Sequence, residues 1–174
     1  MLLRQPGDVN IQAVITIHGQ REFPVPTEGV PHVLILQFDD TEAQSATDPI
    51  QAASVRWRQR EAARIGLNLT PPTREHARQI IEFARTISDI EGTLLCQCLG
   101  GVSRSSAAAL LCLVTWARPD HADECLRHLL ETRACAMPHP DLVAFGDELL
   151  ACDGRLVAAL KNINAKRGPS DTLN

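Results

Sequence analysis

Residues 93–105 read Thr93-Leu-Leu-Cys-Gln-Cys98-Leu-Gly-Gly-Val-Ser-Arg104-Ser105, and an Ala- and Leu-rich run follows as far as Trp116. The first six residues predict a short buried strand, and residues 105–116 predict a buried helix. The two glycines between them predict a turn. The stretch therefore predicts a strand, a glycine turn and a helix, with Cys98 where the turn begins and Arg104 where it ends.

This turn has the composition of an oxyanion site. Its successive backbone N–H groups can point inward, at the positive end of the dipole of the helix that follows. Arg104 adds a permanently charged guanidinium that donates two parallel hydrogen bonds to an oxyanion. We expect phosphate to be held by the following residues: Leu99, Gly100, Gly101, Val102, Ser103 and Arg104.

The same electrostatic field acts on the sulfur of Cys98. A free thiol has a pKa near 8.5, and a helix N-terminus with a nearby cation lowers it to about 3.5–7.5. Cys98 is therefore predicted to be a thiolate nucleophile that forms a phosphocysteine intermediate. Ser105, next to Arg104, is expected to hydrogen-bond the sulfur when it leaves in the second step.

The remaining sequence predicts an α/β domain. Apolar, β-branched runs predict strands at residues 11–17 and 33–38, before the strand at 93–98. Capping residues and helical periodicity predict helices at residues 48–65, 73–87, about 120–132, 141–150 and 155–163. A chain of 174 residues forms one domain of this kind, expected at residues 1–166, with a flexible tail at 167–174.

The loop from Cys98 to Ser105 resembles the signature loop of the protein tyrosine phosphatase superfamily: Cys, five residues, Arg, then Ser or Thr. Gly101-Val-Ser-Arg-Ser105 and the Ala-rich run after it are similar to the bacterial and dual-specificity-like members. Segments around Phe38-Asp39-Asp40, residues 133–140 and residues 142–150 resemble a group of small predicted bacterial tyrosine phosphatases. The resemblance implies three layers, with a central, mostly parallel sheet flanked by helices, and no metal or organic cofactor.

Members of the superfamily protonate the leaving group with an Asp on a separate loop. By resemblance Asp40 takes that role, and Asp39 is the alternative. The chain departs from the family immediately before the nucleophile, where Gln97 replaces the usual His. An amide can hydrogen-bond, but it cannot supply the packing or the charge of an imidazole.

Composition limits the partners. With 21 acidic and 17 basic residues, the chain has a formal net charge of −4 and lacks the basic footprint of a nucleic-acid-binding protein. No secretory signal or membrane-length apolar run is present, so we expect a cytoplasmic protein that keeps its six cysteines reduced. The neutral residues 99–102 favour a phosphorylated protein or a small aryl phosphate as substrate.

Two alternatives to a phosphatase stay open. A sulfurtransferase or an arsenate reductase also places a thiolate in an anion-binding loop, although the Ser-Arg-Ser ending and the Asp39-Asp40 pair favour phosphatase. Gln97 leaves room for a phosphate-binding protein without turnover. A metal site built from His121, Cys125, His128, Cys135 and His139 is a weaker hypothesis, because no paired Cys-x-x-Cys supports it.

Overall fold

The protein is described by a computed structural model that covers residues 9–23, 25–42 and 49–167. Of the tail expected at residues 167–174, only Arg167 is described, as the last residue of a helix. The single domain expected at residues 1–166 extends at its N-terminus beyond the described residues.

A small parallel sheet lies at the centre of the fold. It contains β1 (Ile11–His18), β2 (His32–Gln37) and β3 (Thr93–Gln97), in the order β2-β1-β3. The register pairs Thr16 of β1 with Ile35 on one side and with Gln97 on the other. Because all three strands are parallel, their carboxyl ends meet at one edge of the sheet, and Cys98 follows β3 at that edge.

Two helices lie between β2 and β3 and the others follow β3, as the periodicity predicted, whereas a loop joins β1 to β2. The described elements are α1 (Pro49–Arg64), α2 (Arg74–Thr86), α3 (Arg104–Ala117), a short 3-10 helix (Pro119–His121), α4 (Ala122–Thr132), α5 (Pro140–Leu149) and α6 (Arg155–Arg167). Thr73 caps α2 as expected, since its side chain accepts a hydrogen bond from the backbone N–H of His76. The expected α/β fold class, a parallel sheet flanked by helices, is confirmed, but in the described part of the chain the packed helices cover one face of the sheet, not the two faces that three layers imply.

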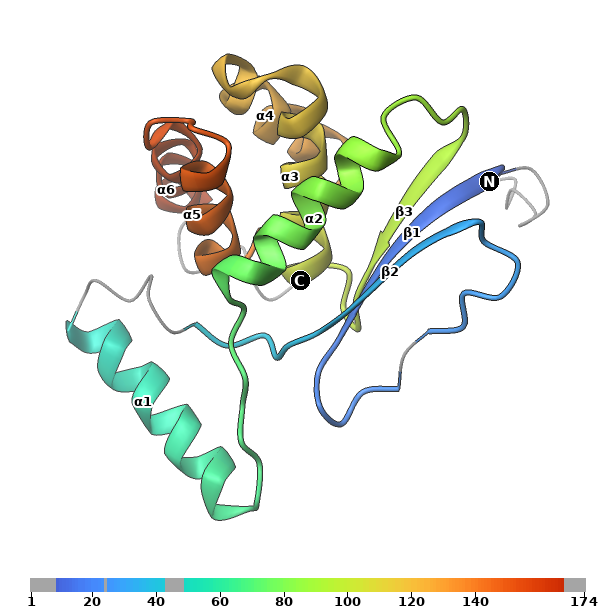
Figure 1. Cartoon of the computed structure of the whole chain (residues 1–174). Helices are drawn as coiled ribbons and strands as arrows, with labels where there is room; N and C mark the ends of the chain where they lie inside the picture. The colour runs from blue at the N-terminus through green and yellow to red at the C-terminus, as the bar shows by residue number, and fades with distance from the viewer. Residues whose placement is uncertain (1–8, 24, 43–48, 168–174) are drawn as a thin grey trace, which may run out of the picture.

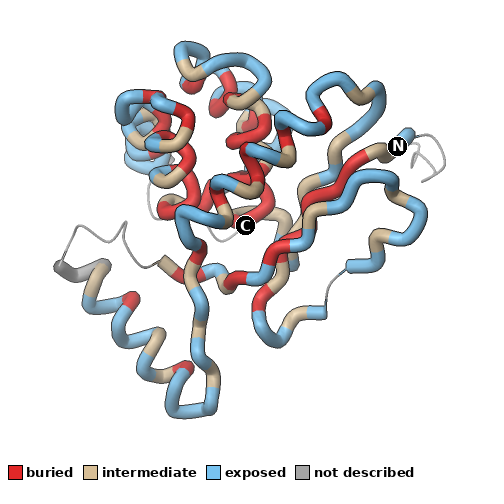
Figure 2. The backbone as a smooth tube through the Cα atoms, viewed as in Figure 1, coloured by how far each residue is buried: buried red, intermediate tan, exposed pale blue. Residues whose placement is uncertain are grey.

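The core lies between the sheet and the helices α2 to α6, which gather on one face of the sheet (Figure 1). Helix α3 runs through the middle of this core and packs against α2, α4, α5, β1 and β3. Its apolar side chains are buried together with those of β1 and β2. Figure 2 shows that many of the residues of α3 and β1 are buried. Burying α3 in this way anchors the helix whose first residue is Arg104.

On the opposite face of the sheet the apolar side chains are less covered. Among the described residues, Val33, Ile35 and Leu95 are exposed on that face. Helix α1 stands apart from the helical layer, beyond the edge of the sheet where the strands end (Figure 1). The edge of the sheet where the strands end is therefore bordered by the loops that follow the strands and by the N-terminus of α3.

The close packing of α3 against α5 yields a first prediction. A Cβ atom on Gly146 would lie 2.0 Å from Cδ2 of the fully buried Leu111. Gly146→Ala should therefore lower the free energy of unfolding by about 1–3 kcal/mol, although an exposed helical glycine would gain about 0.5–1 kcal/mol from the same change. Urea unfolding measures the difference.

The Leu111→Ala variant and the double variant complete a double-mutant cycle. The double variant should lose less stability than the sum of the two single changes, because removing Leu111 opens the space that the new methyl group needs. Additive losses would show that the two side chains do not compete for this space.

Candidate active site

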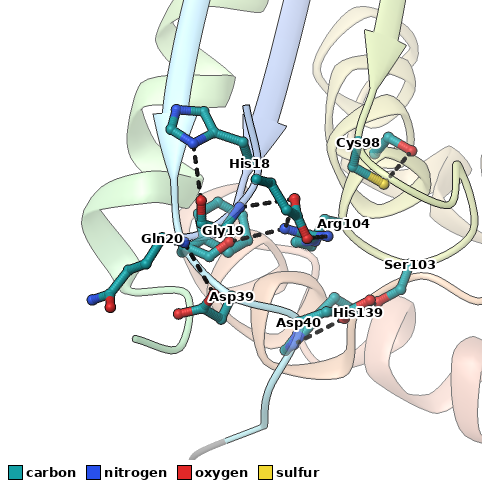
Figure 3. A network of polar contacts seen from close by, with 12 residues as sticks. His18, Gly19, Gln20, Asp39, Asp40, Cys98, Ser103, Arg104 and His139 are labelled. Carbon is teal, nitrogen blue, oxygen red and sulfur yellow. Dashed lines mark hydrogen bonds and ion pairs between the residues drawn. The ribbon is translucent and has the colours of Figure 1, made fainter. Parts of the chain in front are cut away.

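Cys98 and Ser105 face each other across the turn that joins β3 to α3. We call this turn, residues 98–105, the cysteine loop. Cys98 Sγ lies 3.2 Å from Ser105 Oγ, as Figure 3 shows. Gly101 adopts a φ of +62°, a left-handed conformation that favours glycine and lets the loop curl back toward the sulfur. The structure thus brings together the first and last residues of the cysteine loop.

The segment from Arg133 to His139, after α4, holds the cysteine loop by donating hydrogen bonds to its carbonyl groups. Three consecutive carbonyl oxygens of the loop accept hydrogen bonds from this segment. The donors are Arg133 Nε to Gly101 at 2.6 Å, the backbone N–H of Met137 to Val102 at 2.9 Å, and the backbone N–H of His139 to Ser103 at 3.3 Å. A peptide whose carbonyl is held on one side presents its N–H on the other, so this bracing leaves the N–H groups of the loop for an anion.

The surroundings of Cys98 favour the thiolate. Burial alone would raise the pKa of this thiol, but the Ser105 hydroxyl, the backbone N–H groups of Ser105 and Gly101, and the charge of Arg104 together lower the pKa below its usual value. The expected direction of the shift is therefore reproduced, and hydrogen bonds contribute more to it than the arginine does. Gln97 lies half-buried at the end of β3, beside Thr16 of β1.

Arg104 is held by a partner that the sequence did not reveal. The residue is 3% exposed, and Nη1 and Nη2 of its guanidinium donate to the two carboxylate oxygens of Glu22 at 2.9 and 2.8 Å. Nη1 also donates to the Phe38 carbonyl at 3.2 Å. Burial acts against the charge of Arg104, but the Glu22 carboxylate outweighs it and raises the pKa of the guanidinium.

This arrangement leaves one edge of the guanidinium free. Glu22 occupies the end formed by Nη1 and Nη2, whereas Nε makes no hydrogen bond within the described part of the chain. The Nε–H group and the remaining Nη2–H group lie on the same edge and form a second fork, suited to two oxygens of a phosphate. Glu22 was missed because it lies 82 residues before Arg104, with no motif around it.

The structure separates the two aspartates that the sequence left as alternatives. Asp39 is occupied by main-chain groups, since its carboxylate accepts from the N–H of Gln20 at 3.2 Å and from that of Thr70 at 2.8 Å. Asp40 turns toward the cysteine loop, where its Oδ1 accepts from Ser103 Oγ at 2.6 Å (Figure 3). Only Asp40, with its side chain 46% exposed, is therefore placed at the loop and open to solvent.

An open cavity of about 370 Å³ adjoins Cys98 on the side of the loop that follows β1. Its lining includes the apolar residues Phe23, Val25 and Leu99 and the basic residue Arg21. Phe23 and Leu99 are 94% and 78% exposed, so they form an uncovered apolar rim. A cavity of this kind can receive the organic group of a phosphate monoester.

The described residues contain no group of three or more His, Cys, Asp or Glu side chains placed to hold a metal ion. The weaker hypothesis of a site at His121, Cys125, His128, Cys135 and His139 thus finds no support among them. In the same part of the chain, none of the helices has the length and apolar character needed to cross a membrane.

The pKa of Cys98 provides a prediction that needs no substrate. Ser105→Ala removes a hydroxyl that stabilises the thiolate, so the pKa of Cys98 should rise and its alkylation by iodoacetamide near pH 6 should slow several-fold. Peptide mass spectrometry quantifies the modification at Cys98 separately from the other cysteines. Ser106→Ala is the matched control, because the Ser106 hydroxyl donates to the carbonyl of Ser103 at 2.9 Å and not to the sulfur. Equal slowing in both variants would contradict this account.

The ion pair of Glu22 and Arg104 makes stability depend on pH. The pKa of Glu22 is lowered, chiefly by its hydrogen bonds to Arg104. Its contribution to stability is therefore complete above the unfolded-state pKa of about 4.3 and is lost as the pH falls through the lower folded-state pKa. Glu22→Gln should lower the free energy of unfolding by about 1–3 kcal/mol near pH 7, and the difference from wild type should vanish in acid.

Chemical denaturation at a series of pH values measures this difference. Glu28→Gln is a suitable control, because Glu28 is an exposed residue of the same loop. A difference between wild type and Glu22→Gln that persists unchanged into strong acid would show that the Glu22 charge does not stabilise the fold.

Comparison with known proteins supports the fold. No known family profile and no curated protein sequence matches the chain. Two solved structures are similar to it. The structure of Tk-PTP in the active form has a TM-score of 0.54 and 18% sequence identity, and the match covers 82% of this chain and 80% of that one. The structure of a mouse putative dual specificity phosphatase complexed with zinc tungstate has a TM-score of 0.51 and 15% identity, and the match covers 86% of this chain and 76% of that one. The chain therefore has the α/β fold found in a tyrosine phosphatase and in a dual specificity phosphatase.

Proposed function

We propose that this protein is a cysteine-dependent phosphatase that hydrolyses phosphate monoesters through a phosphocysteine intermediate. The observation that carries the proposal is the juxtaposition of Cys98 with an anion-binding loop. The pKa of its thiol is lowered, backbone N–H groups face its sulfur, and the buried Arg104 keeps a free fork of donors. These are the parts that a thiolate needs to attack phosphorus while the phosphate oxygens are held.

In the first step, the sulfur of Cys98 forms a bond to phosphorus while the bond from phosphorus to the ester oxygen breaks. The leaving oxygen takes a proton from the carboxyl group of Asp40, which becomes a carboxylate. In the second step, a water molecule attacks the phosphocysteine and gives a proton to Asp40. The sulfur then leaves as a thiolate stabilised by Ser105, and inorganic phosphate is released.

Within this mechanism Glu22 is a positioning residue. It binds the end of the Arg104 guanidinium, so that the edge carrying Nε is directed at the bound phosphate. The N–H groups of the residues from Leu99 to Arg104 supply the other phosphate contacts, in keeping with the bracing of their carbonyls from behind. This division explains why a single arginine can serve both the fold and the substrate.

We propose a phosphotyrosine-containing protein as the substrate. The apolar rim of the cavity beside Cys98, with Phe23 and Leu99, suits an aromatic leaving group better than a short aliphatic one. The cysteine loop itself carries no basic residue other than Arg104, which fits a substrate with one phosphate rather than several. A small aryl phosphate should serve as a model substrate for the same reasons.

Hydrolysis of p-nitrophenyl phosphate without added metal tests the function. The wild type should turn over between about pH 5 and 8, with inhibition by vanadate, and Cys98→Ser should abolish the activity. Asp40→Asn should lower kcat by about 10²-fold or more for substrates with basic leaving groups and should remove the basic limb of its pH profile.

Asp39→Asn is the matched control for the acid. It should leave the shape of the pH profile intact, because Asp39 serves the main chain at Gln20 and Thr70. Vanadate binding without turnover would favour a phosphate-binding protein instead. Transfer of sulfur from thiosulfate by Cys98 would favour a sulfurtransferase.

A further inference from the structure

The ring of His139 is buried beside the active site, next to polar groups of Asp40 and of the main chain at Thr41. The residue is 1% exposed, and within the described residues neither Nδ1 nor Nε2 makes a hydrogen bond. Native proteins leave few buried polar groups unpaired, and each one calls for an explanation. His139 lies directly before α5, and its backbone N–H braces the cysteine loop at Ser103. Packing of the backbone does not require an imidazole at this position.

The polar group that the ring faces is the carboxylate of Asp40. His139 Nε2 lies 3.8 Å from Asp40 Oδ1, the same oxygen that accepts the hydrogen bond from Ser103 (Figure 3). This separation is longer than a hydrogen bond, and a small rotation of the exposed Asp40 side chain would bring it to a hydrogen-bond distance of about 3 Å. The buried ring is thus aimed at the proposed general acid.

The charged groups around the ring decide its protonation. Burial lowers the pKa of His139, whereas the carboxylates of Asp40, Asp141 and Glu42 and the main chain at Thr41 favour the charged ring. Burial outweighs these groups, so the ring is neutral at neutral pH. A neutral imidazole carries one donor and one acceptor, and it can take up a proton when Asp40 loses one.

We propose that His139 shares with Asp40 the proton that is delivered to the leaving group, and so acts as a positioning residue for the general acid. This inference rests on the proposed phosphatase function. Before the reaction the pair carries one extra proton, which lies either on the carboxyl group of Asp40 or on the ring of His139. We call this protonated form the loaded state. When the phosphorus–oxygen bond breaks, Asp40 Oδ1 gives this proton to the leaving oxygen, directly or after receiving it from Nε2. The pair is left as a carboxylate and a neutral ring, and the water of the second step reloads it.

Sharing has a measurable consequence. Two mutually attracting sites hold one proton up to a higher pH than either site alone, so a pair of a carboxyl group and an imidazole can still donate a proton at a pH where a lone carboxyl group would be ionised. Removing the imidazole should therefore move the basic limb of the kcat profile to lower pH. The loss of kcat should be larger for more basic leaving groups, because these depend more on receiving a proton.

The test compares wild type, His139→Asn and His139→Gln on phenyl phosphate and p-nitrophenyl phosphate across the pH range. Both substitutions should lower kcat for phenyl phosphate about tenfold and shift the basic limb to lower pH, with a smaller loss for p-nitrophenyl phosphate. In an Asp40→Asn background the same substitutions should have no further effect. The affinity for vanadate should stay within about twofold of wild type, which shows that the cysteine loop is intact.

His121→Asn is the matched control, because His121 also lies beside a carboxylate, 3.1 Å from Glu124, but at an exposed position after the far end of α3, the helix that begins at the cysteine loop. It should leave both profiles unchanged. An unmoved basic limb in the His139 variants, or an equal loss of kcat in the Asp40→Asn background, would overturn the proposal.

A titration by nuclear magnetic resonance tests the pairing without turnover. The negative charge of Asp40 raises the pKa of His139, so Asp40→Asn should lower the pKa of this ring below its wild-type value. An unchanged His139 titration would sink the proposal even if the protein is an active phosphatase. A shifted titration without any hydrolysis by wild type would instead reject the phosphatase function and leave the pair intact.

Discussion

The buried charge of Arg104 is the constraint to which most of the active-site architecture responds. A guanidinium that is taken out of water must find partners, and removing one partner from a buried pair is strongly destabilising. Glu22 and the carbonyl of Phe38 supply those partners, and they come from the loops that follow β1 and β2. Three elements that are distant in sequence are therefore tied together at the edge of the sheet where Cys98 lies.

The second requirement is that the cysteine loop keep its N–H groups free. A turn of eight residues could satisfy its own polar groups by folding differently, but the segment from Arg133 to His139 binds its carbonyls one after another. Apart from the ring of His139, this segment contributes no group to the proposed chemistry. Its role is to hold the loop in a conformation whose N–H groups are satisfied by a bound phosphate rather than by other groups of the loop.

The Asp39-Asp40 pair shows how neighbouring carboxylates acquire different tasks. Asp39 satisfies main-chain N–H groups from two loops, so its position is fixed by the fold. Within the described ranges, Asp40 accepts its hydrogen bond from Ser103 and faces the buried ring of His139, so it remains available to a substrate. One residue of the pair thus stabilises the loops around the site, and the other is left for proton transfer.

The sequence by itself determined the local features: the loop with Cys98 and Arg104, the capped helix α2 and the burial of α3. These depend on residues close together in the chain, where spacing and periodicity carry the information. Only the tertiary structure decided that Glu22 holds Arg104, that Asp40 rather than Asp39 faces the loop, and that His139 lies behind Asp40. Such pairs join residues tens of positions apart, and they meet only because parallel strands bring their carboxyl ends to a common edge and the packed helices present their N-termini there.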